Sequence, residues 1–237
     1  MLFSKAHNNS KTRGVNVRFY PPTMLLLFIL AIFLLLFFFI LLQLHIITFA
    51  FEKLGFGVFT VFIILMGSLI GSLINIPIKE IPNEITAEQT VSFYGIRYRI
   101  PHYQPNYTQL SINIGGALIP SFVSVYLWMS GDNLVIPIIA TAIVAIIVNR
   151  VAKPVAGLGI ATPLFIPPLA ALLVAFILAS GDAPRVAYIS GTMGTLIGVY
   201  LLNINKIKDL GAPVASIGGA GTFDGIFITG ILAVLFA

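Results

Sequence analysis

The sequence predicts an all-α, polytopic helical membrane protein with about seven transmembrane helices, and three observations indicate this fold class. The 237 residues are 58% hydrophobic and only 9% charged, with a mean hydropathy of +1.03. The charged residues divide the chain into seven apolar stretches, and the Lys and Arg residues gather between alternate stretches. A soluble domain carries roughly 25% charged residues to solvate its surface, so lipid is the expected solvent for this one.

Each apolar stretch has the length of one membrane-spanning helix, which needs about 20 apolar residues. The first stretch follows a basic, polar segment at 1–22, which we expect to be cytoplasmic. That stretch is too long for a signal peptide and has no small-residue cleavage site nearby. Residues 23–237 should therefore form a single transmembrane domain. Its predicted spans are 23–49, 55–77, 109–129, 134–152, 157–179, 186–204 and 211–236.

The distribution of positive charge predicts the orientation of these spans. Only Lys53 and Arg185 fall on the outside if the N-terminus lies in the cytoplasm. The other 11 of the 13 Lys and Arg residues then fall in four cytoplasmic segments, at 1–22, 78–108, 150–156 and 205–210. This bias follows the positive-inside rule. We therefore expect a protein of the cell (inner) membrane with a cytoplasmic N-terminus and an outside C-terminus.

The one long polar segment is the predicted cytoplasmic loop 78–108. Within it Ile96, Tyr98 and Ile100 alternate with Arg97 and Arg99, a period of two that predicts a short hairpin. Its Tyr and Arg residues suit the level of the lipid headgroups. The segment is either a gate or partner surface or a solvated loop lying on the membrane.

Asp224 is the ionisable residue that lies deepest inside a predicted span. Fourteen residues separate it from Asp209 and thirteen follow it, which places it near the bilayer midplane at about 1.5 Å per residue. Four glycines crowd the segment Gly218-Gly219-Ala220-Gly221-Thr222-Phe223-Asp224-Gly225, and they predict a broken seventh span. Thr222 is a candidate cap for a half-helix that would present Asp224 to a midmembrane site. Alternatively, the glycines form a packing surface and Asp224 is protonated or hydrogen-bonded to a neighbouring helix.

A second glycine interruption repeats the first. The tetrapeptide Ile-Gly-Gly-Ala occurs at 114–117 and at 217–220, near the cytoplasmic ends of two spans that run in the same direction. Paired interruptions of this kind point to a transport site, although chance recurrence is an alternative in a chain rich in these residues. The candidate ion- or substrate-binding residues are Asp224, Thr222, Gly218, Gly219, Gly221, Asn113, Gly115 and Gly116. The fifth span is also expected to be irregular because it contains Pro163, Pro167 and Pro168.

Asp182 allows a catalytic alternative. In one interpretation Asp182 is a loop residue that pairs with Arg185. In the other it is the second carboxylate of an aspartyl dyad with Asp224. Two close carboxyl groups cannot both ionise, so one can act as an acid and the other as a base.

The run 216–237, which contains Gly218-Gly219-Ala220-Gly221-Thr222-Phe223-Asp224-Gly225-Ile226-Phe227, resembles the signature of an uncharacterised, domain-of-unknown-function family of bacterial and archaeal multi-span membrane proteins. The resemblance extends through Asn113-Ile114-Gly115-Gly116 and most of the chain after the first span. It implies a membrane location and no activity. A weaker similarity relates Gly219-Ala220-Gly221 and Asp224 to the Gly-x-Gly-Asp motif of intramembrane aspartyl proteases of the presenilin type. The aspartate here is displaced by two positions, and Pro168-Leu169-Ala170 only loosely matches the Pro-Ala-Leu element of those enzymes.

Other chemistry finds little support in the composition. There is no cysteine, and His7, His45 and His102 are scattered, so no metal and no cofactor is expected. Phosphate-binding and nucleophile-elbow motifs are absent from the sequence. The gathering of Lys and Arg in cytoplasmic segments accounts for the net charge of +5, so this charge does not indicate nucleic acid as a partner. We expect the lipid bilayer and a small ion or solute as partners. Three functions remain: a transporter or permease, an intramembrane aspartyl protease, and a non-catalytic scaffold or partner subunit. The substrate, the coupling ion and the oligomeric state stay open.

Overall fold

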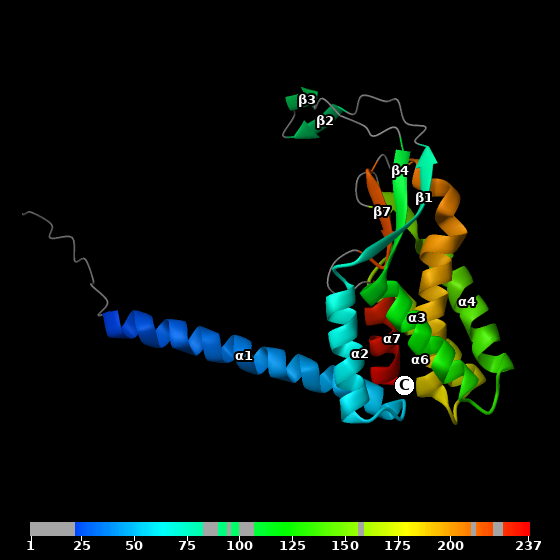
Figure 1. The fold of residues 1–237 in the computed structure, drawn as a ribbon, viewed down its shortest axis with the longest axis horizontal. Helices are drawn as coiled ribbons and strands as arrows, with labels where there is room; N and C mark the ends of the chain where they lie inside the picture. Colours follow the sequence, from blue (N-terminus) through cyan, green and yellow to red (C-terminus); the bar gives the residue numbers. More distant parts are fainter. Residues whose placement is uncertain are drawn as a thin grey trace, which may run out of the picture. The chain divides into compact units, whose positions relative to one another are not determined.

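The computed structural model describes residues 22–82, 90–93, 96–99, 107–155, 159–209, 212–219 and 225–237. Most of these residues are helical (Figure 1). The α-helices are α1 (Pro22–Lys53), α2 (Val58–Gly71), α3 (Ile119–Met129), α4 (Val135–Val151), α5 (Ile166–Leu178), α6 (Ala183–Thr195) and α7 (Gly225–Phe236). α3 is preceded by a π-helical turn, η1 (Ile114–Leu118). α6 is followed by a second π-helical turn, η2 (Leu196–Tyr200), and then by a 3₁₀ helix, η3 (Leu201–Asp209). Contacts divide the chain into two units, residues 1–44 and 45–237.

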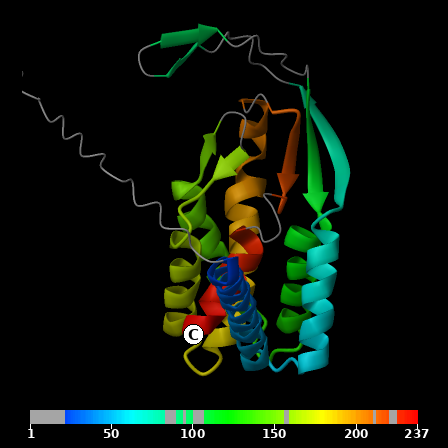
Figure 2. The ribbon, with the colours of Figure 1, turned by 90° about the vertical axis from the view of Figure 1, so that its left-hand side faces the viewer.

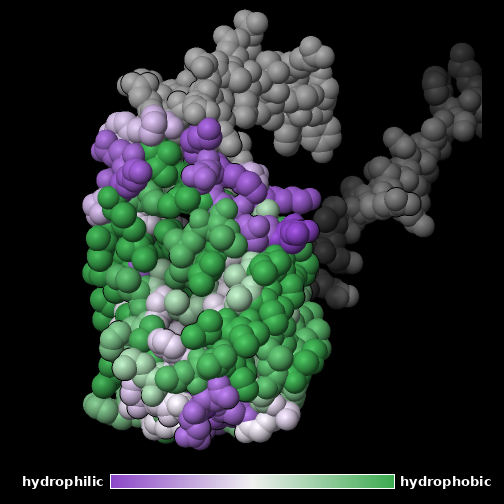
Figure 3. Space-filling view, turned by 90° about the vertical axis from the view of Figure 1, so that its right-hand side faces the viewer, coloured by the Kyte–Doolittle hydropathy of each residue, from purple (hydrophilic) through white to green (hydrophobic). Residues whose placement is uncertain are grey.

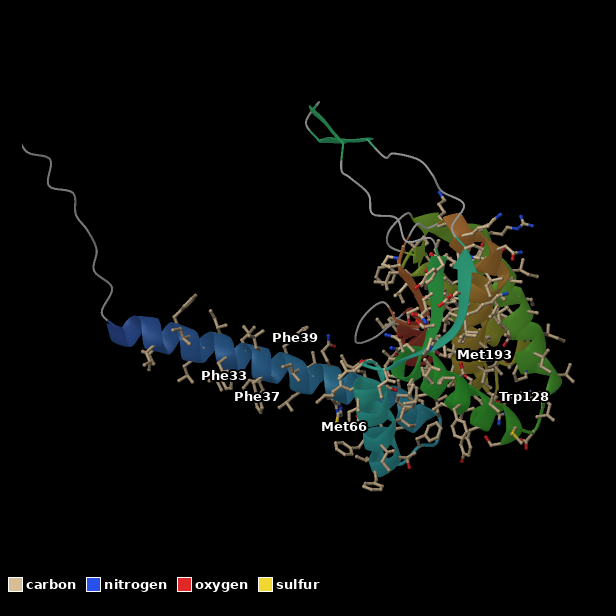
Figure 4. All side chains as sticks on the ribbon, turned by 45° about the horizontal axis from the view of Figure 1, so that its top comes forward. Phe33, Phe37, Phe39, Met66, Trp128 and Met193 are labelled. Atoms are coloured by element: carbon tan, nitrogen blue, oxygen red, sulfur yellow. The ribbon has the colours of Figure 1, made fainter. Side chains whose placement is uncertain are left out.

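The first unit contains most of α1, which is apolar on every side. Its side chains from Leu26 to Leu44 are all exposed. Phe33 and Phe37 project from one side of the helix and Phe39 from the other (Figure 4). A helix without a polar face is typical of a membrane span. Residues 26–53 are long and apolar enough to cross a bilayer.

The second unit is built around α6. This helix packs against α3, α4, α5 and α7, and with η2 and η3 it forms a continuous apolar helix from Ala183 to Lys208 that is also long enough to cross a bilayer. Its glycines allow close packing: a Cβ at Gly194 would lie 2.7 Å from Cγ1 of Val144 in α4. Small residues on one face of a helix permit this close approach of a neighbouring helix.

Five other helices are apolar but shorter, between 10 and 17 residues. Many of their large hydrophobic side chains are exposed, including Phe59 of α2 at 76% and Ile177 of α5 at 79%. In Figure 3 a broad hydrophobic belt separates two hydrophilic zones at opposite ends of the second unit. Soluble monomers rarely expose apolar surface this extensive.

The prediction of an all-α chain is wrong, because parts of four predicted spans form β-strands. A three-stranded sheet has the order β1 (Asn75–Pro82), β4 (Tyr107–Asn113) and β7 (Val214–Ile217). β1 pairs with β4 antiparallel, and β4 pairs with β7 parallel. The sheet lies at one end of the helices (Figures 1 and 2). The apolar runs 55–77, 109–129 and 211–236 are thus each divided between a strand and a helix.

The hairpin expected in the loop 78–108 is present: β2 (Thr90–Phe93) pairs antiparallel with β3 (Ile96–Arg99). A second hairpin joins β5 (Lys153–Val155) and β6 (Gly159–Ala161), so the fifth predicted span, 157–179, also begins as a strand. Pro167 and Pro168 lie in the first turn of α5. Proline is tolerated there because those amides have no partner inside the helix. These two prolines therefore begin a helix and do not kink one.

Candidate functional site

The two Ile-Gly-Gly-Ala segments lie side by side. The parallel pairing of β4 and β7 sets Ser111 opposite Ser216 and Ile112 opposite Ile217. Gly218, which has a φ of +75°, follows β7 directly. A Cβ on Gly218 would lie 2.7 Å from the Cβ of Ala117. The backbone of the second copy at Gly218 therefore packs against the first copy.

Gly115 makes the corresponding close approach on the other side of η1. A Cβ at this position would overlap the carbonyl oxygen of Ser68 and the amide nitrogen of Ser72, at the end of α2. Gly71 lies at the same crossing, where a Cβ would be 3.0 Å from the amide nitrogen of Gly115. The glycines thus let three backbone segments meet where side chains would separate them.

A buried asparagine connects these segments. Asn113, only 1% exposed, ends β4. Its Nδ2 donates to the carbonyl oxygen of Ser72 at 2.8 Å and to Oδ1 of Asn75 at 3.0 Å, and its Oδ1 accepts from the amide of Gly116 at 2.8 Å. The side chain therefore caps η1 and joins α2, β1 and β4, while Oδ1 keeps one further acceptor site.

Asn75 and Ser216 extend this polar cluster toward the second tetrapeptide. Ser216 Oγ donates to Oδ1 of Asn75 at 2.5 Å, and a Cβ at Gly219 would overlap Ser216 Oγ and lie 3.2 Å from Oδ1 of Asn75. Gly219 therefore lies with its backbone against the two side chains. We call Asn75, Asn113, Ser216 and the glycines at 115, 116, 218 and 219 the junction cluster.

Two helical segments begin after the strands of the junction cluster. η1 starts directly after Asn113 and continues into α3, and α7 starts at Gly225. A hydrophobic group that includes Ala117 of η1, Leu196 of η2, Ile217 of β7 and Ile226 of α7 packs beside it. Residues of both π-helical turns thus belong to one hydrophobic cluster. Such turns are rare and occur frequently at functional sites.

Sequence reasoning therefore selected residues that the fold brings together from two distant segments. Asn113, Gly115, Gly116, Gly218 and Gly219 all lie in the junction cluster. Gly221, Thr222 and Asp224 lie outside the described residues.

Asp182 lies elsewhere, directly before α6. Its carboxylate forms an ion pair with Arg185, and its side chain is partly exposed. The next residue, Ala183, packs with Ala233 and Ala237 at the far end of α7. About 12 Å of helix axis separates Ala233 from Gly225 at 1.5 Å per residue.

Among the described residues, no group of three or more His, Asp or Glu could hold a metal ion.

Sequence reasoning missed two members of the cluster and a set of hydroxyl groups near it. Asn75 and Ser216 carried a usable signal, since each is a polar residue inside a predicted span and close to one of its ends. The hydroxyls belong to Tyr188, Thr192 and Thr195 of α6, all 2% exposed or less. Their spacing of four and three residues, legible in the sequence, indicates one face of a helix.

A groove of about 400 Å³ lies on the outside of the helices, between α3, α4 and α6. Trp128 and Met193, labelled in Figure 4, are among its lining residues, which are almost all apolar. Its polar contributions are the hydroxyls of Ser124 and Thr141. Ser124 Oγ donates to the carbonyl oxygen of Pro120 at 2.9 Å, so this groove offers little polar chemistry to a ligand.

No curated protein and no solved structure matches this chain at a significant level. The family described as "Protein of unknown function (DUF1614)" matches residues 69–236, a range that contains the whole junction cluster and omits α1. It covers more than two thirds of the 237 residues, and it confirms the resemblance to an uncharacterised family. The chain therefore belongs to the DUF1614 family.

Proposed function

We propose that this protein is a seven-helix membrane permease in which a small ion passes the junction cluster and Asp224. The observation that carries the proposal is the parallel pairing of β4 and β7, because it sets side by side the two strands that precede the shortened helices α3 and α7. Discontinuous helices that meet at an interface form the midmembrane sites of many transporters. The acceptor site left on Asn113 and the backbone groups freed by the glycines provide polar atoms there.

The length of α7 supports a site at membrane depth. This helix has 12 residues, about 18 Å at 1.5 Å per residue, whereas the hydrocarbon core is about 30 Å thick. A helix this short begins inside the membrane if its other end reaches the surface. Asp224 directly precedes its first residue, Gly225, in the sequence, and the proposal assigns its carboxylate to that depth. An ionisable residue at that depth is costly and is a functional candidate.

The charged ends of the second unit support the proposed orientation. Basic residues gather at the end that carries the sheet, namely Lys79, Arg150, Lys153, Lys206 and Lys208. Lys53 and Arg185 lie at the opposite end, where Lys53 Nζ donates to the carbonyl oxygen of Leu235 at 3.1 Å. By the positive-inside rule, the sheet faces the cytoplasm and the C-terminus lies outside the cell membrane.

The protease alternative has less support. It requires the carboxyl groups of Asp182 and Asp224 to lie close enough to share a proton. Asp182 pairs instead with Arg185, at the level where α7 ends, whereas Asp224 precedes the start of α7. The scaffold alternative leaves the paired glycine segments without a role beyond packing.

Flux through liposomes that contain the purified protein tests the proposal. Two probes are used: protons, followed with an internal pH-sensitive dye under an imposed potential, and radioactive sodium uptake. We expect the wild type to carry at least one probe faster than protein-free liposomes do. Asp224→Asn should reduce that flux to the protein-free level, because the amide has neither the negative charge that would attract a cation nor a carboxylate that takes up and releases a proton.

Asp182→Asn is the matched control, since it removes a carboxylate of the same size from the same unit. We expect it to leave the flux unchanged. Wild-type flux equal to that of protein-free liposomes for both probes, or full flux in Asp224→Asn, would overturn the proposal.

A further inference from the structure

The apolar groove on the outside of the helices exists because α3 and α4 stand apart. Both helices pack against α6, whereas no extensive contact joins α3 to α4. Residues of α3 and α4 form the walls of the groove, and α6 forms its floor with Ile189, Met193 and Ile197. Trp128 of α3 lines one wall, and Figure 4 labels it together with Met193. The groove is therefore a lateral opening between two neighbouring helices.

The size of the lining side chains indicates that another helix is not the occupant. Helices that associate in a membrane approach each other through small residues, above all glycine. No glycine lines this groove, and Gly194 of α6 is already in contact with Val144 of α4. At the rim, Val125 and Ile138 are 41% and 54% exposed. Such branched side chains hold a rigid partner helix at a distance but leave room for a thin, flexible chain.

The volume of the groove leads to the same conclusion. Ile189 and Ile197 are eight residues apart, which is about 12 Å along the helix axis. A helix of that length and about 10 Å in diameter occupies roughly 900 Å³, whereas the groove holds about 400 Å³. A hydrocarbon chain is much narrower than a helix and can follow the floor of the groove lengthwise. The apolar lining and the volume therefore fit one acyl chain.

Polar groups mark one end of the groove. Arg185 lies one helical turn before Ile189 on the same side of α6. Its guanidinium group lies against the loop between α3 and α4, since a Cβ at Gly131 would overlap it. The indole Nε1 of Trp128 donates to the carbonyl oxygen of Leu134 in that loop at 2.8 Å. Tryptophan and arginine at helix ends are typical of the level of the lipid headgroups.

The charges at this end complement a zwitterionic headgroup. Arg185 forms an ion pair with the carboxylate of Asp182, and the two side chains are 19% and 44% exposed. Nε of Arg185 is buried and has no hydrogen-bond partner among the described residues. Arginine carries five N–H donors in a planar fork that suits a phosphate, and the ion pair does not use all of them. The partly exposed carboxylate of Asp182 can accept from an ammonium group.

We infer that the groove between α3 and α4 binds one acyl chain of a zwitterionic phospholipid from the outer leaflet. Its phosphate lies at Arg185, its ammonium group lies at Asp182, and the chain runs inward along Ile189, Met193 and Ile197. The inference goes beyond the proposed permease function and shares with it only the orientation in the membrane. Lipid binding at this groove requires neither ion flux nor Asp224.

Trp128 reports directly on the groove, because it lines the groove and is the single tryptophan of the chain. The full-length protein in detergent is titrated with phosphatidylethanolamine that carries bromine atoms on its acyl chains, because bromine in contact with an indole quenches its fluorescence. The same lipid without bromine is the reference for every variant. We expect quenching that saturates at an equimolar ratio of lipid to protein and is reversed by an excess of the reference lipid.

A matched pair of variants on α4 tests the acyl-chain site. Ala142 is exposed and lines the groove, so Ala142→Phe fills the groove with a ring and should abolish the saturable quenching. Ile143→Phe places the same ring at the next position, which is 37% exposed and outside the groove lining. This control should be quenched like the wild type. Monodisperse elution and unchanged helical circular dichroism confirm that each variant is folded.

A second pair tests the headgroup site. Arg185→Gln should weaken the binding of brominated phosphatidylethanolamine about tenfold, because a charge-assisted contact to the phosphate is lost. Arg150→Gln, at the opposite end of the second unit, should leave it unchanged. Brominated phosphatidylglycerol keeps the phosphate and lacks the ammonium group, so it should bind the wild type more weakly than phosphatidylethanolamine.

The contrary outcomes are distinct from those of the flux experiment. No saturable quenching of the wild type, or equal quenching of the wild type and Ala142→Phe, would overturn the inference. Equal affinity for the two brominated lipids, or for Arg185→Gln and the wild type, would overturn the assigned headgroup contacts. A wild-type dimer that Ala142→Phe converts to a monomer in light scattering would assign the groove to a second copy of the chain. Failure of flux alone would overturn the permease proposal and leave lipid binding in place.

Discussion

The backbone of Gly218 lies directly against Ala117, so that a Cβ at position 218 would be 2.7 Å from the Cβ of Ala117. These residues are about a hundred positions apart in the chain, and each belongs to one of the two Ile-Gly-Gly-Ala segments. Gly218 also has a φ of +75°, a conformation that residues with a side chain rarely adopt. Two independent constraints therefore require glycine at this position.

Gly218→Ala should destabilise the protein strongly. The left-handed backbone alone costs roughly 1–2 kcal/mol in a residue with a Cβ, and the overlap with Ala117 adds to that cost. Thermal unfolding in detergent, followed through the fluorescence of the single tryptophan, Trp128, measures the change. Gly181→Ala is the control, because nothing lies within 4 Å of a Cβ there. Equal stability of the two variants would contradict the packing described for Gly218.

Asn113→Ala should cost more stability than the same change at Asn133, although both side chains cap helices. Asn133 Oδ1 is exposed and accepts from the amides of Val135 and Ile136 at 2.9 and 3.0 Å, so its loss should cost about 1 kcal/mol. Loss of Asn113 leaves the buried amide of Gly116 without its acceptor and removes the hydrogen bonds to Ser72 and Asn75, and we expect about 2–4 kcal/mol. Denaturant unfolding of the two variants in the same detergent checks the order.

Gly194→Ala and Gly67→Ala should change stability in opposite directions. Alanine at 194 would place its Cβ 2.8 Å from the Cβ of Val144, and forcing α4 and α6 apart should cost about 1–3 kcal/mol. Alanine at 67 meets only Cδ1 of Ile119, at 3.4 Å, and replaces a glycine inside α2, which should stabilise the helix by up to about 1 kcal/mol. Unfolding temperatures measured side by side test the contrast, and a stabilising effect of Gly194→Ala would contradict it.

Single cysteines can test the proposed orientation, since the chain contains none of its own. Asp132 lies in the exposed loop between α3 and α4, and Lys206 lies in the last turn of η3. A membrane-impermeant maleimide should label Asp132→Cys in intact cells and label Lys206→Cys only after the membrane is disrupted. The reverse pattern would contradict a cytoplasmic sheet.

The sequence predicted the helices better than the strands, and the reason is physical. Long charge-free stretches identify apolar elements, but hydropathy alone does not distinguish a buried strand from a helix. β4 shows the difficulty: Gln109-Leu110-Ser111-Ile112-Asn113 alternates polar and apolar residues, a strand pattern that the apolar stretch around it obscured. The shortened helices α3 and α7 follow directly from the residues that β4 and β7 take.

The candidate site was predictable in part because it depends on glycine. Recurrence of Ile-Gly-Gly-Ala identified both halves of the junction cluster, although it did not predict that a parallel strand pair joins them. Asn75 was missed because its role depends on a contact with Ser216, 141 positions away.

The pairing of β4 with β7 has a mechanical consequence. Helices that touch only through side chains can slide or rotate past one another by small steps. Two strands in a hydrogen-bonded ladder cannot, because any shift breaks several bonds together and turns side chains to the opposite face. The segments that lead into α3 and α7 are therefore fastened to each other and must travel as one piece. Any rearrangement of the surrounding helices therefore has to keep β4 and β7 together, because a change of register between them would first have to break the ladder.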